Sequence, residues 1–262
     1  MVLSAALEEL SLFYNPSLYD SYHTGKQFYF DRKTDQLFWL NVARTYGDPI
    51  LELACGTGRV TAPLAEQGFQ LTGIDISGSM LNAARKKSPQ VEWIQADIRD
   101  FDVGMKFPLI LLPYFSIQHL LDLGDVESCL QCVKKHLRPN GRFIIDIMHP
   151  SPSYLSELSY TSNLRLADCI FEDPMGRGNI VVTATREYEA SLQVVKEYLY
   201  YHIPGEDKEL SESLEFRLYF SQEFEMLLKY NGFKVENKFG DYFSSPFTSE
   251  SDQMILICSP RP

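Results

Sequence analysis

Between residues 50 and 147, short apolar runs alternate with amphipathic stretches, and this alternation restricts the fold more than any other feature of the sequence. A short apolar run predicts a buried strand, whereas apolar residues three and four apart predict a helix. Strands that alternate with helices form a parallel sheet with right-handed crossovers. We expect strands at 50–54, 69–74, 91–95, 109–112 and 143–147, helices at 34–46, 60–67, 80–87 and 126–137, and a turn at Pro139-Asn140-Gly141.

The pattern changes after Pro150, where strands follow one another without helices between them. Residues 180–188, 192–203 and 214–220 read as such strands, which predicts an antiparallel insert. Ser221 is the expected N-cap of a helix that runs to Tyr230, and Asn231-Gly232 ends this helix because both residues tolerate left-handed backbone. Two closing strands, 233–239 and 253–258, complete the chain.

Charge and composition exclude several classes of protein. The chain has 24 Lys and Arg against 35 Asp and Glu, a net charge of −11, which argues against a nucleic-acid partner because phosphate binding needs a basic face. Residues 1–150 hold 17 acidic and 14 basic side chains, net −3, and residues 151–262 hold 18 and 10, net −8. No apolar run is long enough to span a membrane, and the N-terminus has no signal-peptide pattern. The five cysteines lack disulfide or zinc-site spacing. We therefore expect a cytoplasmic protein with no membrane partner and no metal.

The stretch LELACGTGRV, residues 51–60, is the most informative motif. An expected strand carries Glu52, Gly56 and Gly58 permit a tight turn, and a helix follows at once. Such a turn allows close approach of a ligand to the backbone, and the helix N-terminus supplies N–H donors. Taken alone, the motif is equally consistent with a glycine-rich turn that binds nothing.

Polar residues at the ends of the next strands make a ligand site the better interpretation. Asp75 ends the second strand, where a carboxylate can accept hydrogen bonds from both ribose hydroxyls. Met80 begins the next helix and can lie over an adenine. Asp97 ends the third strand and can accept from an adenine amino group, with Ile98 beside the ring. Each residue alone is more often a cap or a core residue, but their order describes an adenosine pocket at the carboxyl edge of the sheet.

The type of adenosine cofactor follows from the residues around the glycines. A nicotinamide fold usually shows GxGxxG, but Thr61 occupies the sixth position here, and no GK[ST] follows as a P-loop would need. Glu52 would repel a pyrophosphate and suits a cationic ligand such as the amino-acid end of a sulfonium cofactor.

The motifs LELACGTGR, GIDIS with Met80, QADI and GRFIIDI closely resemble those of the class I S-adenosylmethionine-dependent methyltransferases, most strongly over residues 49–147. The resemblance implies a Rossmann-like α/β fold: a seven-stranded sheet whose last strand is antiparallel and lies between the fifth and sixth, with an antiparallel β insert after the fifth strand. It implies four segments: an N-terminal lid and leading helix (1–48), a cofactor-binding core (49–150), a substrate-side insert (151–220) and the last helix with the closing strands (221–262). It implies S-adenosylmethionine held by Glu52, Ala54, Gly56, Gly58, Asp75, Ile76, Met80, Asp97, Ile98 and Pro113.

The segment LLPYFSIQHL resembles that of small-molecule N-methyltransferases, including enzymes acting on amino sugars, which have a His at the place of His119. The resemblance implies a small-molecule acceptor, with a cationic amine favoured, and leaves the oligomeric state open. His119, Tyr14 and Tyr19 are the candidate catalytic residues, and Tyr22, Tyr114, Ser116, Gln118 and Arg186 the candidate substrate residues. Two alternatives stay open: an O-methyltransferase acting on a hydroxyl or carboxyl group, and a non-catalytic cofactor-binding protein on the same fold.

Overall fold

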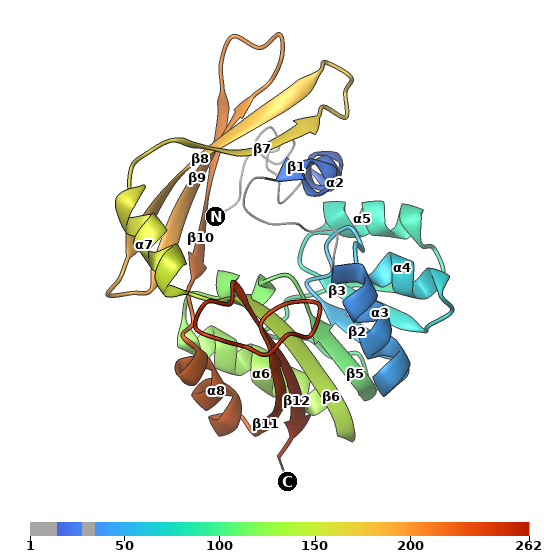
Figure 1. Ribbon diagram of the computed structural model, residues 1–262. Helices are drawn as coiled ribbons and strands as arrows, with labels where there is room; N and C mark the ends of the chain where they lie inside the picture. Colours follow the sequence, from blue (N-terminus) through green and yellow to red (C-terminus); the bar gives the residue numbers. More distant parts are fainter. Residues whose placement is uncertain (1–14, 28–34, 262) are drawn as a thin grey trace. The chain divides into compact units, whose positions relative to one another are not determined.

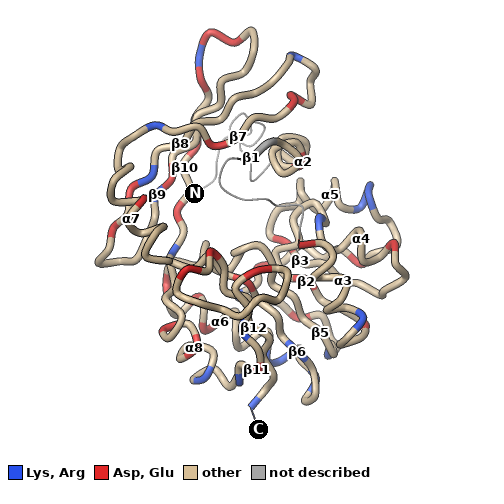
Figure 2. The backbone as a smooth tube through the Cα atoms, viewed as in Figure 1, with Lys and Arg blue, Asp and Glu red and all other residues tan. Residues whose placement is uncertain are grey.

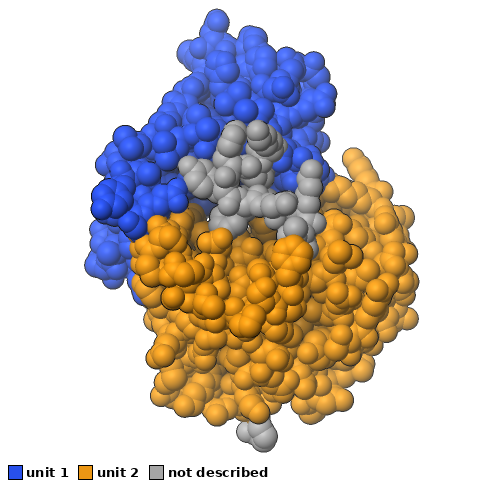
Figure 3. Space-filling view, viewed as in Figure 1, with its two compact units in different colours: residues 1–33, 156–215 blue, residues 34–155, 216–262 orange. Residues whose placement is uncertain are grey.

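The computed structural model describes residues 15–27 and 35–261, which belong to two compact units (Figures 1 and 3). Unit 1 comprises residues 1–33 and 156–215, and unit 2 comprises residues 34–155 and 216–262. The chain therefore leaves unit 2 after its first strands and helices and returns to complete it. The functional division into four segments at residues 48, 150 and 220 stays a prediction.

Unit 2 contains a seven-stranded sheet in the order β11-β12-β6-β5-β2-β3-β4. The strands β2 to β6 pair in parallel, and β12 runs antiparallel to both β6 and β11. This confirms the expected sheet, with its last strand antiparallel between the fifth and sixth strands of the core. The strands are β2 (Ile50–Leu53), β3 (Leu71–Asp75), β4 (Glu92–Gln95), β5 (Phe107–Leu112), β6 (Leu137–Met148), β11 (Phe233–Phe239) and β12 (Gln253–Pro260).

Helices bury both faces of this sheet, so its central strands are apolar on successive residues. Leu109 and Ile110 are adjacent in β5 and both fully buried, yet they belong to different core clusters because alternate side chains point to opposite faces. One cluster packs with α6 and α8, and the other with α3, α4 and α5. These helices are α3 (Asp35–Tyr46), α4 (Thr61–Glu66), α5 (Gly78–Lys87), α6 (Leu123–His136) and α8 (Ser221–Tyr230), and a 3-10 turn, η1 (Ser116–His119), follows β5.

Two local predictions are wrong. Pro139-Asn140-Gly141 does not separate helix from strand, because β6 begins at Leu137, directly after α6. Its pairing with β5 passes from Leu137, opposite Phe107, to Arg142, opposite Leu109, so the Pro-Asn-Gly residues form an irregularity within β6 and have no partner in β5. Ser221 is the first residue of α8 rather than its N-cap, and Phe220 takes the cap position. The Phe220 N–H donates to the Glu223 carboxylate at 3.3 Å, which replaces the expected serine cap.

Unit 1 contains the antiparallel sheet that the sequence predicts after residue 150. Its order is β1-β7-β8-β9-β10, and the pairs β1–β7, β7–β8 and β8–β9 are antiparallel. Leu18 and Tyr22 of α2 pack with buried residues of β7 to β9, including Phe171 and Val182. The strands β1 and β7 and the helices α2 and α7 were not expected, and β10 begins and ends earlier than the expected strand 214–220. The elements are α2 (Pro16–Thr24), β1 (Lys26–Gln27), α7 (Pro152–Tyr160), β7 (Leu166–Glu172), β8 (Asn179–Glu189), β9 (Val194–His202) and β10 (Leu210–Arg217).

Negative charge is concentrated in unit 1. Residues 156–215 hold 12 acidic and 5 basic side chains, a net charge of −7, which is most of the excess after residue 150. Figure 2 shows these charges along the strands and loops of the unit. Within the described part of the chain, no helix combines the length and apolar character needed to cross a membrane. All five cysteines are free thiols.

Candidate active site

Residues 54–59, which we call the glycine loop, connect β2 to α4 at the carboxyl edge of the sheet. Ala54, Gly56 and Gly58 have φ angles of 53°, 55° and 79°, so the loop turns through left-handed backbone that glycine adopts at little cost. The Gly56 N–H donates to Asp75 Oδ2 at 2.7 Å. This bond ties the glycine loop to the end of the neighbouring strand β3.

Asp75 is therefore fixed in orientation. Its second oxygen, Oδ1, accepts from the Ser77 N–H at 2.8 Å. Burial raises the pKa of Asp75, and the N–H donors partly oppose this effect. Beside it, Ile76 is 62% exposed, which is high for a large apolar side chain, whereas Met80 is buried in the first turn of α5. A fixed carboxylate next to an exposed aliphatic side chain suits a ribose attached to a flat apolar ring.

Glu52 lies in β2 and is only 2% exposed. Its carboxyl group accepts a hydrogen bond from the Thr61 hydroxyl at the start of α4. Burial raises the pKa of Glu52 to about 8, and the nearby Arg59 guanidinium opposes this shift. Glu52 is therefore largely protonated near neutral pH, and a cation bound beside it would favour its charged form.

Trp93 of β4 lies beneath the glycine loop and was missed in the sequence. A Cβ at Gly58 would come within 2.7 Å of the Trp93 ring, and one at Gly73 within 2.6 Å. The indole N–H donates to the Ser88 carbonyl at 2.9 Å, which holds the ring in place. Both glycines are thus required where they stand because the ring occupies the space of a side chain.

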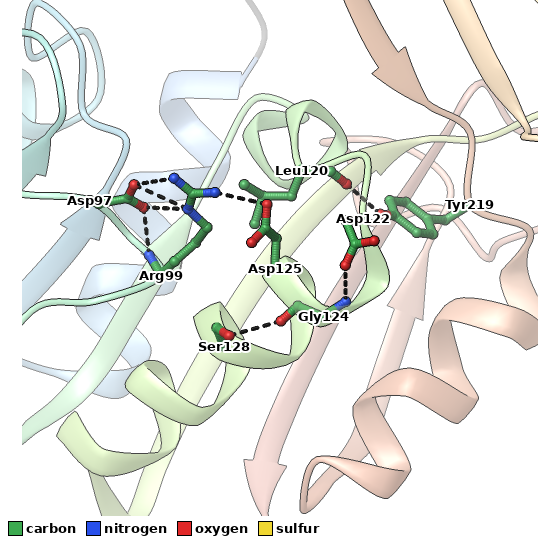
Figure 4. A network of polar contacts seen from close by, with 8 residues as sticks. All are labelled: Asp97, Arg99, Leu120, Asp122, Gly124, Asp125, Ser128 and Tyr219. Atoms are coloured by element: carbon green, nitrogen blue, oxygen red, sulfur yellow. Dashed lines mark hydrogen bonds and ion pairs between the residues drawn. The ribbon is translucent and has the colours of Figure 1, made fainter.

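Asp97 is part of a charged network with Arg99 and Asp125 (Figure 4). Both carboxylate oxygens of Asp97 accept from the Arg99 guanidinium, at 2.6 to 3.1 Å. Arg99 also donates to Asp125 of α6 at 2.8 Å. The Arg99 hydrogen bonds lower the pKa of Asp97, so this side chain stays a charged acceptor. Ile98, between them, is partly buried against the core.

Residues 113–119, which we call the β5 turn, follow the carboxyl end of β5. Pro113 is buried, and its carbonyl accepts from the Ser116 hydroxyl at 2.8 Å. The Gln118 side-chain amide is only 1% exposed and pairs with main-chain groups of Met148 and Arg217, so its polar atoms hold this turn in place. His119 ends η1 and is exposed.

Tyr114 begins this turn with a left-handed φ of 63°. Its N–H donates to Asp146 Oδ1 at 2.6 Å, and the Tyr242 hydroxyl donates to Asp146 Oδ2. Asp146, at the carboxyl end of β6, is completely buried, which raises its pKa to about 7. It was missed, although it follows an apolar run, Phe143 to Ile145, as Asp75 follows one in β3.

The remaining candidates belong to unit 1. Tyr22 and Arg186, 164 residues apart, meet at Asp168, whose carboxylate accepts from the Tyr22 hydroxyl at 2.7 Å and from Arg186 at 2.7 Å. Arg186 also pairs with Glu197. Tyr19 lies edge-on to His23 in α2. Tyr14 lies outside the described residues. The roles of these residues toward an acceptor stay predictions.

Comparison with known proteins identifies the fold. Residues 50–141, which include β2 to β5 and the glycine loop, match the family described as "Methyltransferase domain". This segment of the chain is a methyltransferase domain. A dTDP-3-amino-3,6-dideoxy-alpha-D-glucopyranose N,N-dimethyltransferase of Streptomyces fradiae is 25% identical over 84% of this chain and 83% of its own length.

Solved methyltransferases share the fold of this chain. An S-adenosylmethionine-dependent methyltransferase from Clostridium acetobutylicum superposes with a TM-score of 0.74, 22% identity, and coverage of 89% of this chain and 94% of its own. A sugar N-methyltransferase from Streptoalloteichus gives a TM-score of 0.70, 20% identity, and coverage of 88% and 89%. S-adenosylmethionine is bound in the solved structures of an amino pentose methyltransferase from Micromonospora echinaspora and of a glycopeptide N-methyltransferase.

The residues of the glycine loop and strand ends fit this cofactor. The Asp75 carboxylate is held by main-chain N–H groups, Ile76 is exposed beside it, and a buried, protonatable Glu52 lies in the strand that leads into the loop. Within residues 15–27 and 35–261, no three His, Cys, Asp or Glu side chains form a group that could hold a metal ion.

Proposed function

We propose that this methyltransferase transfers a methyl group from S-adenosylmethionine to an amine nitrogen of a small molecule. The observation that carries the proposal is the position of His119, an exposed imidazole on the turn that leaves β5. Strand β5 pairs directly with β2, and β2 leads into the glycine loop, so the turn and the loop leave the same edge of the sheet. The amino-sugar dimethyltransferase of Streptomyces fradiae and the sugar N-methyltransferase of Streptoalloteichus support the amine acceptor.

The bound cofactor supplies a methyl group on a positively charged sulfur, and the protein supplies alignment and exclusion of water. Asp75 would bind the ribose hydroxyls and Asp97 the adenine amino group, while Glu52 would face the cationic amino-acid end. An amine must lose its proton before its lone pair can attack, and an imidazole can accept that proton near neutral pH. We assign this step to His119. The Tyr114 and Ser116 side chains of the same turn are the proposed acceptor contacts.

A panel of acceptors tests the proposal. The purified protein is incubated with S-adenosylmethionine and matched amines, amino sugars, alcohols and carboxylates, and S-adenosylhomocysteine formation is measured. We expect turnover with amines. Turnover confined to hydroxyl or carboxyl acceptors would make the protein an O-methyltransferase, and cofactor binding without turnover on any acceptor would favour a non-catalytic role.

His119→Asn tests the assigned proton acceptor, because the amide keeps a polar group but does not accept a proton. We expect kcat to fall about 100-fold while cofactor affinity stays unchanged. The matched control is His202→Asn, since His202 is also exposed but lies in β9 of unit 1. Equal kcat values for wild type and His119→Asn would remove His119 from the mechanism.

A further inference from the structure

Arg59 is the last residue of the glycine loop and contacts the β5 turn. Its guanidinium carbon lies 4.7 Å from the centroid of the Tyr114 ring. A guanidinium over an aromatic face is an attractive cation–π arrangement, and it is stronger when both groups are partly withdrawn from water. The Arg59 side chain is 17% exposed. The contact therefore joins the loop that follows β2 to the turn that follows β5.

The orientation of Arg59 is fixed from the other side by Asp35 of α3. The two guanidinium nitrogens pair with the two carboxylate oxygens of Asp35 at 2.9 and 2.8 Å, and Asp35 is 2% exposed. Asp35 also accepts from the Trp39 indole N–H at 3.1 Å. A bidentate pair fixes the plane of the guanidinium as well as its position. Arg59 therefore presents a defined face to Tyr114.

The main chain of Tyr114 is held independently of its ring. Its N–H bond to the buried Asp146 supports a left-handed backbone that a tyrosine seldom adopts. Asp146 is in turn held by the Tyr242 hydroxyl, and the Tyr242 ring packs against Trp39 with centroids 6.2 Å apart. All of these residues belong to unit 2. The ring contact with Arg59 is thus the direct link from Tyr114 to the glycine loop.

We propose that Arg59 is a positioning residue that transmits occupancy of the glycine loop to the β5 turn through the ring of Tyr114. When the cofactor fixes the glycine loop, Arg59 fixes the Tyr114 ring and with it the turn that carries Ser116 and His119. The β5 turn is then held more tightly when the cofactor is bound than when it is not. This inference rests on the proposed function in placing the acceptor at the β5 turn, but its test requires neither turnover nor an acceptor.

Hydrogen exchange with S-adenosylhomocysteine as the probe tests the coupling. In the wild type, we expect the ligand to slow amide exchange in residues 114–119. Arg59→Lys keeps a positive charge opposite Asp35 but loses the planar fork and its defined stack, so the ligand-dependent slowing should fall about threefold. Arg142→Lys is the matched control, because Arg142 also pairs with a carboxylate, Glu236, and lies 5.8 Å from a tyrosine ring, Tyr46, away from the β5 turn. This control should keep the wild-type slowing.

A second pair of variants, at Tyr114, makes the conclusion of the exchange experiment independent of whether Arg59→Lys folds correctly. Tyr114→Phe keeps the ring and should retain the slowing, whereas Tyr114→Leu loses the ring and should lose it. Wild-type slowing in Arg59→Lys or in Tyr114→Leu would overturn the coupling, as would an equal loss in Arg142→Lys. A failed amine panel with intact coupling would overturn the proposed function alone.

Discussion

At the scale of single residues, the proposed role of the buried Glu52 carboxyl would link protonation to cofactor binding. Burial raises its pKa to about 8 from an ordinary value of 4.5, so the folded protein holds a proton that the unfolded chain releases between these pH values. The free energy of unfolding should therefore fall as pH rises through this window. A cationic group bound beside Glu52 lowers its pKa and expels the proton.

We predict that S-adenosylhomocysteine binding near pH 7 releases up to about one proton in the wild type and markedly fewer in Glu52→Gln. Calorimetry in buffers of different ionisation enthalpy measures this number. Glu66→Gln, the same substitution at an exposed position in α4, should release as many protons as the wild type. Equal release by Glu52→Gln and the wild type would show that Glu52 does not face the cationic end of the ligand.

The sequence predicts residues that end strands better than residues that touch across the fold. Asp75 and Asp97 stand out because each polar residue follows an apolar run. Asp146 has the same local pattern and could have been found in this way. The contacts of Arg59 and Trp93 could not, because their partners lie many residues away and are brought together by the pairing of β2 with β3 and β5 and of β3 with β4.

At the scale of elements, the glycine loop depends on both backbone conformation and packing. Gly58 has a φ of +79°, and a Cβ there would also meet the Trp93 ring. Gly68 has a similar φ of +92°, but a Cβ there would have no neighbour within 4 Å. Substitutions at these two glycines therefore separate the free-energy cost of a left-handed backbone from the cost of a clash with the Trp93 ring.

We predict that Gly68→Ala costs about 1 kcal/mol of unfolding free energy from backbone strain, and that Gly58→Ala costs roughly 1–3 kcal/mol more because overpacking is added. Urea denaturation measures both values. Cofactor affinity should fall in Gly58→Ala only. Equal destabilisation of the two variants would mean that Trp93 yields to a methyl group, and that the close packing beneath the loop is not essential.

The predicted boundaries of helices and strands agree with the structure where the hydrophobic periodicity is unbroken, and they differ from it elsewhere. The central strands of unit 2 are found because both of their faces are buried. Strand β7 was missed because its register shifts between Ala167 and Cys169, which interrupts the alternation of buried and exposed residues. Pro139-Asn140-Gly141 carries strong turn residues, and these residues form an irregularity within β6, between the paired residues Leu137 and Arg142, rather than a turn before the strand.

At the scale of the whole molecule, the net charge divides unequally between the two units. The proposed cofactor residues lie in unit 2, whereas unit 1 carries a net charge of −7 over residues 156–215. Sequence composition predicts this difference in charge, but it does not predict which of the charged side chains are buried and paired. Asp168 is 5% exposed and joins Tyr22 to Arg186, so part of the charge of unit 1 is buried structure and not solvated surface.

This distinction predicts unequal effects for two ion pairs of unit 1. Asp168→Ala leaves the Arg186 guanidinium with one fewer partner in a largely buried place, and should cost about 3 kcal/mol. Glu209→Ala breaks the Arg165–Glu209 pair, whose side chains are 38% and 42% exposed, and should cost under about 1 kcal/mol because water screens this pair. Hydrogen exchange in β7 and β8 measures both losses. Because the cofactor residues belong to unit 2, S-adenosylhomocysteine affinity should be unchanged in both variants. Equal losses of stability in the two variants would mean that the Asp168 cluster is as well solvated as a surface ion pair. The negative charges of unit 1 would then be available to attract a cationic acceptor.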